Sequence, residues 1–213
     1  MEHLDGIAER IHQAFETRTA IRDRVLAQTR TLTRHCANAI RAVHRGENEL
    51  AEQNLAEAGK LANSIRTMTV GYSDLYYAGY SQDALKELAE ASIVYALLNN
   101  GQLPTPQALQ LEDATYLQGL AEAVGELRRR SLDALLKGES DEAQRLLVLM
   151  DDIYAVLVTM DYPDAITGGL RRLTDIARSL IERTRGDLTL SLRQEHLERS
   201  LKRVEERLGK VDG

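Results

Sequence analysis

Two pairs of acidic residues have the spacing that brings side chains onto one face of a helix. Glu87 and Glu90 are three residues apart, and Glu122 and Glu126 are four apart. Residues separated by three or four positions are neighbours on a helix surface. Four carboxylates in one place would bind Mg²⁺ or Mn²⁺, hard cations that prefer oxygen ligands. Such a cation could activate water for hydrolysis of a phosphodiester bond.

The neighbours of these pairs in the sequence bear on whether the carboxylates meet. Val94 and Leu98 continue the stripe begun by the first pair, which favours its partial burial, and a shielded carboxylate needs a cation, a proton or a metal. Gly119 and Gly125 lie near the second pair and would permit close helix approach. If the two helices pack antiparallel, all four carboxylates converge. The spacing also allows exposed or salt-bridged acids, the commoner state of carboxylates.

A second feature is a basic segment from Thr17 to Gly46. It holds seven arginines and one acidic residue, Asp23, which gives it a charge of +6 in a chain whose total is −6, so the remainder carries −12. On a helical wheel of about 100° per residue, four of the arginines fall within about 60° of one another, with His44 just beside them. We call these four the arginine stripe: Arg30, Arg34, Arg41 and Arg45.

The arginine stripe is suited to a polyanion such as RNA or DNA, because arginine makes bidentate contacts to phosphate. The opposite face of the same helix is apolar, with Val25, Leu32, Cys36 and Val43, and Ile40 at its flank. A solvated helix face is the alternative interpretation. Solvated faces usually mix charges of both signs, whereas the basic segment contains seven arginines and a single acid. This imbalance favours phosphate binding.

The elements that must position these residues are helices. Ala, Leu, Glu and Arg dominate the composition, and only three prolines and 4% aromatic residues occur. We predict an all-α fold, a single domain over residues 1–213 with about seven helices. Gly46, Gly138 and Gly186 are expected to end helices, and Ser81 to cap one. The expected helices span about 3–44, 47–68, 81–99, 111–136, 141–160, 161–185 and 190–208, with turns at 71–80 and a loop after 99.

Composition also excludes several classes of protein. Cys36 is the single cysteine, so neither an intrachain disulfide nor a cysteine-rich zinc site is expected, and a reducing, cytoplasmic setting is the default. The first residues, MEHLDGIAER, lack the apolar core of a signal peptide. No run of about 18 apolar residues is present, so we expect no membrane span.

Three segments together resemble the translin superfamily. The run YYAGYSQDALKELAEA from Tyr76 resembles the segment that carries the family's E-x-x-E motif, and YLQGLAEAVGELRRRSLDAL from Tyr116 resembles its later acidic motif. The run RDRVLAQTRTLTRHCANAIRAVHRGE resembles the family's basic nucleic-acid-binding helix. Order and spacing agree over roughly residues 18–207, and the similarity is greatest to the Trax branch. It implies a translin-like α-helical bundle.

The resemblance further implies an Mg²⁺- or Mn²⁺-dependent endoribonuclease that prefers single-stranded RNA and works inside a closed, roughly octameric shell of identical subunits. By resemblance, the catalytic and metal-binding residues are Glu87, Glu90, Glu122 and Glu126. The nucleic-acid-binding residues are the arginine stripe and His44. Glu122 departs from the pattern, since Trax has Asp there; the extra methylene bears on octahedral Mg²⁺ geometry and so on catalysis more than on binding.

Two other functions remain open from the sequence. The first is a non-catalytic protein that binds RNA or single-stranded DNA, as translin does, with the same arginine stripe and shell. The second is a helical oligomer with no nucleic-acid role, which predicts no salt-dependent RNA binding. Self-association is also indicated by two apolar stripes that could equally be core: Leu146, Leu149, Ile153 and Val156, and Leu173, Ile176 and Leu180.

Overall fold

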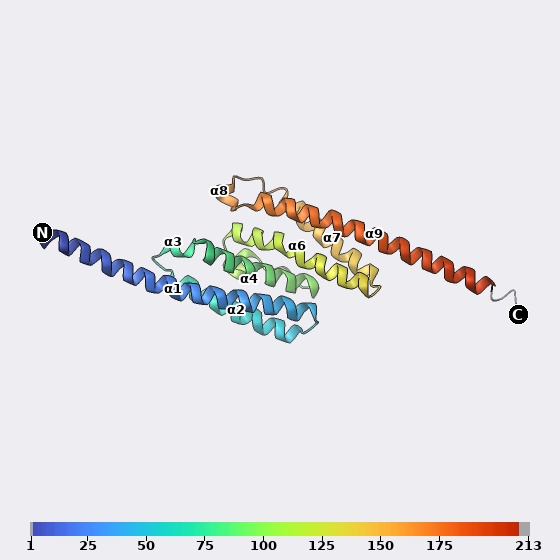
Figure 1. Cartoon of the computed structure of the whole chain (residues 1–213), viewed down its shortest axis with the longest axis horizontal. Helices are drawn as coiled ribbons and strands as arrows, with labels where there is room; N and C mark the ends of the chain where they lie inside the picture. The colour runs from blue at the N-terminus through green and yellow to red at the C-terminus, as the bar shows by residue number, and fades with distance from the viewer. Residues whose placement is uncertain (1, 209–213) are drawn as a thin grey trace. The chain divides into compact units, whose positions relative to one another are not determined.

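The computed structural model describes residues 2–208, and every regular element within them is a helix (Figure 1). The all-α prediction is therefore confirmed. None of the helices in this range is long and apolar enough to cross a membrane. Backbone contacts divide the chain into two compact units, Met1–Gly119 and Leu120–Gly213. The assignment of residues 1–213 to a single domain stays a prediction.

The first unit begins with a helical hairpin formed by α1 (Glu2–His44) and α2 (Asn48–Met68). Between them Gly46 has a φ of +75°, and its amide donates to the Val43 carbonyl at 3.0 Å. The amide of Glu47 donates to the Ala42 carbonyl at 2.9 Å. These two bonds form the Schellman motif that ends helices at glycine, so the expected stop at Gly46 is confirmed.

The region expected to be a turn contains α3 (Ser73–Tyr76), and the next helix, α4 (Gly79–Leu98), starts two residues before Ser81. The prediction that Ser81 is an N-cap is wrong. Its buried hydroxyl donates to the Leu75 carbonyl at 2.8 Å, so it ties α4 to α3. A serine in a first turn can bond backward to a preceding segment as readily as it caps, and the sequence does not distinguish the two.

The loop after α4 holds another one-turn helix, α5 (Pro106–Leu109), whose first turn is capped by the Thr105 hydroxyl accepting from the Ala108 amide at 3.1 Å. Arg66 of α2 fixes this loop by donating to the Leu109 carbonyl at 2.7 Å. The first two turns of α6 (Asp113–Leu136) complete the unit.

The core of the first unit lies where α1, α2 and α4 meet. Ala42, Val43 and Ala51 form a buried cluster against which Tyr95 and Leu98 pack. Because late residues of α1 meet late residues of α4, these two helices run in the same direction (Figure 1). The register of this parallel pair decides which charged side chains come together.

The second unit contains the rest of α6, then α7 (Ser140–Leu157), α8 (Asp164–Thr167) and α9 (Leu170–Leu208). Gly138 ends α6 with a second Schellman motif, as its φ of +75° and the 2.9 Å bond from the Glu139 amide to the Ala134 carbonyl indicate.

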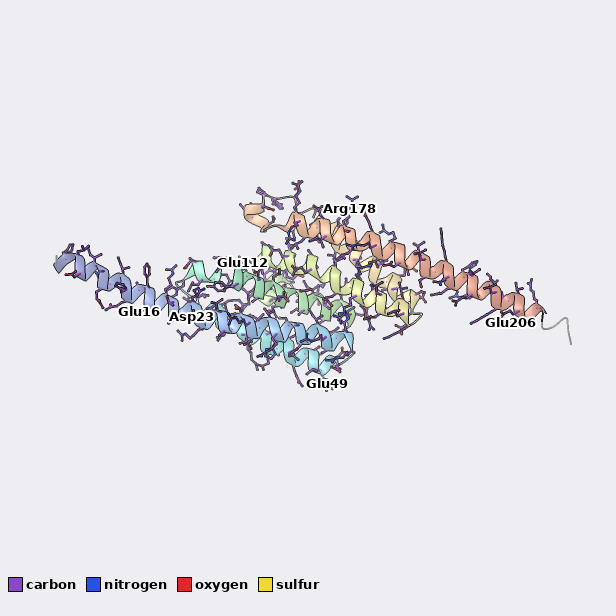
Figure 2. The ribbon with its side chains drawn as sticks, in the orientation of Figure 1. Glu16, Asp23, Glu49, Glu112, Arg178 and Glu206 are labelled. Carbon is purple, nitrogen blue, oxygen red and sulfur yellow. The ribbon has the colours of Figure 1, made fainter. Side chains whose placement is uncertain are left out.

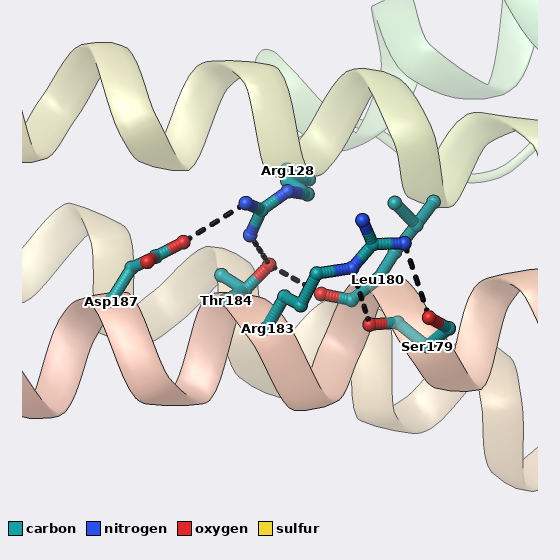
Figure 3. A network of polar contacts seen from close by, with 6 residues as sticks. All are labelled: Arg128, Ser179, Leu180, Arg183, Thr184 and Asp187. Carbon is teal, nitrogen blue, oxygen red and sulfur yellow. Dashed lines mark hydrogen bonds and ion pairs between the residues drawn. The ribbon is translucent and has the colours of Figure 1, made fainter.

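The predicted break at Gly186 is wrong, because α9 continues through it. Thr184 is fully buried and Leu188 nearly so, and both lie on the apolar face that crosses the glycine. Arg128 of α6 donates to the Thr184 hydroxyl at 2.8 Å and pairs with Asp187 at 2.9 Å, as Figure 3 shows. A glycine inside a helix costs about 1 kcal/mol, which packing on both sides of it can offset.

Nine helices therefore occur in residues 2–208 where about seven were expected. Three of the nine, α3, α5 and α8, are single turns that a periodicity of 3.6 residues cannot reveal. Two expected helices, 161–185 and 190–208, are largely the one helix α9.

Candidate nucleic-acid interface and metal-binding carboxylates

The arginine stripe lies on the exposed face of α1. All four of its arginines are exposed, while Val25, Leu32 and Cys36 on the opposite face are fully buried. His44 is half-buried beside the stripe. Asp23, the one acid in this segment, also reaches solvent (Figure 2). The stripe is thus a basic surface that the fold leaves accessible within the first unit.

The arginines of this segment differ in how the protein already engages them. Arg18 pairs with Asp74 at the start of α3, and Arg45 pairs with Glu47 at 3.2 Å. Arg41 donates to the Asn38 side chain at 2.5 Å. Arg30 and Arg34 make no ion pair or side-chain hydrogen bond with any residue in 2–208, so both guanidinium groups are free to bind a phosphate.

The first carboxylate pair projects from α4 and is half-buried at both Glu87 and Glu90. The surrounding positions Leu85, Leu88 and Ala89 are buried, which holds the backbone of α4 against its neighbours. Partial burial, predicted from the apolar stripe, is confirmed.

The pair also lies close to the buried thiol of α1. Burial, and after it the negative charges of Glu87 and Glu90, raise the pKa of Cys36 far above its usual value. The thiol therefore stays protonated and is not a nucleophile, and the two carboxylates impose a negative field on the α1–α4 interface.

Gly119 permits α6 to approach α4 beside this pair. A Cβ at position 119 would lie 2.6 Å from the Ala89 Cβ, 2.8 Å from the Lys86 carbonyl oxygen and 2.9 Å from the Glu90 amide nitrogen. No side chain fits in that space. The expectation of close approach is confirmed at Gly119. It is not borne out at Gly125, where the nearest atom is 4.0 Å away, an ordinary contact.

The direction of α6 against α4 differs from the expectation. Thr115 donates to Gln82 at 2.6 Å, and four residues later Gly119 meets Lys86 and Glu90. Residue numbers rise together along both helices, so the two helices run parallel at this contact, and the antiparallel packing considered above as one way for the carboxylates to converge does not occur there. The cause is the long connection after α4, which returns the chain to the start of α4 before α6 begins.

The second pair lies further along α6, an uninterrupted helix from Asp113 to Leu136. Glu122 is three residues beyond Gly119, so helix geometry puts it about 60° around the axis and about 4.5 Å along it. Both Glu122 and Glu126 are half-buried, and Arg129 lies 3.7 Å from Glu126.

A cavity of about 380 Å³ joins the arginine stripe to the first carboxylate pair. Arg30 of the stripe and Glu87 of the pair both line it. Two further residues that the sequence did not single out, Tyr80 and Asp83, also line it. Their signal in the sequence is the spacing of Tyr80, Asp83 and Glu87, which places all three on one face of α4. The full lining is Thr29, Arg30, Thr33, Tyr80, Asp83, Ala84 and Glu87.

Comparison with known proteins gives consistent results. An uncharacterised protein of Methanocaldococcus jannaschii is 30% identical over 191 residues, which cover 87% of this chain and 83% of that protein. The structure of AfC3PO in complex with duplex RNA is similar at 33% identity with a TM-score of 0.79, covering 86% of this chain and 95% of the other. Crystal structures of AfC3PO alone (32% identity, TM-score 0.79, covering 86% and 96%) and of apo-NeC3PO (19%, 0.77, covering 90% and 98%) are also similar, the latter in fold alone.

The translin family model matches residues 20–209, a range that begins within the basic segment and includes all of α9. The resemblance inferred from the three sequence segments is thereby confirmed. With that match over most of its length and the helical architecture it shares with the C3PO structures, this chain belongs to the translin family and is Trax-like.

Proposed function

We propose that this protein is an Mg²⁺- or Mn²⁺-dependent endoribonuclease that binds RNA, preferably single-stranded, within a closed oligomer of identical subunits. One observation carries the proposal: Arg30, an exposed cation, and Glu87, a half-buried carboxylate, line the same cavity. A nuclease of this type needs a cation for the phosphate and oxygen ligands for a metal within one site.

The proposed metal ligands are Glu87, Glu90, Glu122 and Glu126. Carboxylate oxygens are the donors that Mg²⁺ and Mn²⁺ prefer, and half-burial keeps them ordered without removing them from solvent. The close contact at Gly119 supports the set, because it holds the α6 backbone against the segment of α4 that carries the first pair. Glu122 in place of Asp would loosen octahedral geometry and favour Mn²⁺, the less demanding ion.

In the proposed reaction the chain's own residues bind and orient the substrate. Arg30 and Arg34 would hold phosphate oxygens of the RNA, fixing the position of the scissile bond relative to the carboxylates. The four glutamates would hold the divalent cation, and a carboxylate oxygen of the set would orient the attacking water by accepting a hydrogen bond from it. A bound divalent cation would supply the Lewis acidity that lowers the pKa of that water and stabilises charge on the phosphate.

RNA binding is supported by the likeness to AfC3PO, whose structure is reported with duplex RNA at 33% identity to this chain. Assembly is supported by apolar side chains exposed at helical spacing on both long helices. On α1 they are Leu4, Ile11 and Phe15, and on α9 they are Leu190, Leu197, Leu201 and Val204. A roughly octameric shell with the arginine stripe facing inward would bury such residues and keep the acidic remainder of the chain outside. A cytoplasmic setting is proposed from the single cysteine.

The test uses the full chain and 5′-labelled single-stranded RNA. Replacing Glu90 or Glu126 by Gln keeps the side-chain volume and removes the charge, so cleavage in Mg²⁺ or Mn²⁺ should fall at least roughly 100-fold, since even outer-shell changes reduce metal-site activity 10- to 100-fold. RNA binding measured in EDTA should be unchanged. Glu49→Gln, an exposed acid at the start of α2, is the matched control and should cleave normally.

The rival function is binding of RNA or single-stranded DNA without cleavage. The 3.7 Å contact of Glu126 with Arg129 favours it, because a carboxylate already engaged by an arginine is a poorer metal ligand. Cleavage that survives both glutamine substitutions, or that is absent in every metal while RNA is still bound, would decide for the rival.

A further inference from the structure

The cavity between α1 and α4 has features that metal binding and phosphate binding leave unexplained. Tyr80 and Asp83 form part of its wall. They lie about one helical turn apart on α4, and neither belongs to the proposed set of metal ligands. The cavity measures about 380 Å³, near the lower end of the range for small-molecule sites, which is roughly 300–1,000 Å³. That volume is sufficient for one nucleotide.

Tyr80 has a polar atom in need of a partner. Its hydroxyl oxygen is shielded from solvent and makes no hydrogen bond with any residue in 2–208. Buried hydroxyls nearly always have a partner, so this one has hydrogen-bonding capacity that a water or a polar ligand atom in the cavity can fill.

Asp83 can only accept hydrogen bonds, whereas the Tyr80 hydroxyl can donate one. Asp83 is exposed, and it forms no ion pair or hydrogen bond with any residue in the described range. An ionised carboxylate only accepts hydrogen bonds, so its partner must be an N–H or O–H donor. Charge disfavours a phosphate as that partner, so within a bound nucleotide the partners are the donor groups of the base or ribose.

The other side chains of the cavity fix the orientation of such a ligand. Arg30 is the one cation in its lining, so the phosphate belongs beside Arg30. The Thr29 hydroxyl is already committed to the Leu26 carbonyl at 3.0 Å and offers no donor to a ligand. With the phosphate at Arg30, the base faces the α4 wall that carries Tyr80 and Asp83.

We propose that this cavity is a single-nucleotide subsite in which Asp83 selects bases that carry an amino group on the pairing edge, while the Tyr80 hydroxyl hydrogen-bonds the nucleotide. Carboxylates accept from the N4 amino group of cytosine. Uracil has a carbonyl oxygen at the same position, which a carboxylate repels. The pairing edge is readable only in an unpaired base, so the subsite requires a single strand. The inference rests on the proposed RNA binding and adds base selection to it.

The sharpest test compares binding of CMP with binding of UMP, since their bases differ at the C4 substituent and the adjacent ring nitrogen. Calorimetric titration of the full chain in EDTA should show CMP binding roughly 5- to 10-fold more tightly, the lower part of the range for a discriminating base contact. Asp83→Asn should remove or reverse this ratio, because an amide can donate to the uracil carbonyl. Tyr80→Phe should weaken both nucleotides about equally.

Matched controls are Glu49→Gln for Asp83→Asn and Tyr162→Phe for Tyr80→Phe, both at exposed positions outside the cavity. They should bind CMP and UMP as the unmodified chain does. Equal affinity for CMP and UMP that Asp83→Asn leaves unchanged would overturn the subsite. Cleavage of random-sequence RNA, with the cut ends sequenced, separates the two proposals: cutting without base preference removes the subsite alone, whereas a CMP preference without any cutting supports the subsite and removes the nuclease.

Discussion

Arginines occur in two regions of this protein with opposite consequences. On α1, Arg30 and Arg34 are exposed and make no ion pair within residues 2–208. On α9, Arg178 pairs with Glu182 at 3.0 Å, and Arg185 with Asp151 at 2.7 Å. The same residue type is thus left open for a ligand in one region and neutralised by the protein's own acids in the other. Local charge balance, more than the number of arginines, decides which surface can bind an anion.

The largest expected effect tests that comparison through RNA binding. The double variant Arg30→Gln/Arg34→Gln should bind single-stranded RNA roughly 10- to 100-fold more weakly, and the slope of log affinity against log salt should fall by about 1 to 2, because two phosphate contacts are lost. Fluorescence anisotropy across a salt series in EDTA measures both quantities.

The matched control for this experiment is Arg178→Gln/Arg185→Gln, which removes the same charge from the internally paired region. It should change RNA affinity less than about twofold, since counterions are released only by arginines that contact phosphate. If both double variants lose affinity equally, net charge rather than the arginine stripe governs binding, and the comparison is broken.

A second prediction concerns the free energy of unfolding. Here the loss of an internally paired arginine should have the larger effect, and the loss of an arginine of the stripe the smaller one. Arg128 joins α6 to α9 through Asp187 and the buried Thr184 hydroxyl, and its own side chain is 19% exposed. Arg128→Met should lower the free energy of unfolding by about 1 to 2 kcal/mol, because it leaves polar groups without their partner. Arg34→Met, at an exposed and unpaired position, should change it by less than about 0.5 kcal/mol. Urea denaturation at one fixed protein concentration compares them, and equal losses would contradict this assignment.

The smallest expected effect is on the free energy of unfolding, and it tests whether α9 is continuous through Gly186. Gly186 lies inside this helix with open space where a Cβ would point, so Gly186→Ala should raise the free energy of unfolding by about 0.5 to 1 kcal/mol. At Gly119 the same change should destabilise, since the added Cβ would lie 2.6 Å from the Ala89 Cβ and 2.8 Å from a backbone oxygen. Thermal melts followed by circular dichroism report the sign; a loss of stability at Gly186 would mean that α9 needs the glycine.

Much of the architecture was predictable, because it follows from helix propensity and periodicity. The bounds of α1 and α2 were expected to within about a residue, and Gly46 and Gly138 end helices as predicted. The failures share one cause, which is competition from tertiary contacts. Ser81 bonds to Leu75 rather than capping α4, and Gly186 is carried through α9 by packing on both sides.

The candidate site was predictable to a similar degree. Helical spacing indicated that Glu87 and Glu90 share one face of α4, and that Arg30 and Arg34 lie on the face of α1 opposite to its buried residues. The structure shows both arrangements. The roles of these residues stay predictions. Tyr80 and Asp83 were missed because an isolated tyrosine and aspartate carry no motif; their importance appears only when α1 supplies the other wall of the cavity.

The sequence by itself determined the helical class, the exposure of the arginine stripe and membership of the translin family, since these depend on local pattern and on similarity along the chain. Only the tertiary structure decided that α4 runs parallel to both α1 and α6, and that Arg30 and Glu87 border one cavity. The physical reason is that helix periodicity fixes the direction of a side chain around its own axis. The direction and register of the neighbouring helix depend on the connections between helices and on which side chains meet across them, and the spacing of residues within one helix contains neither.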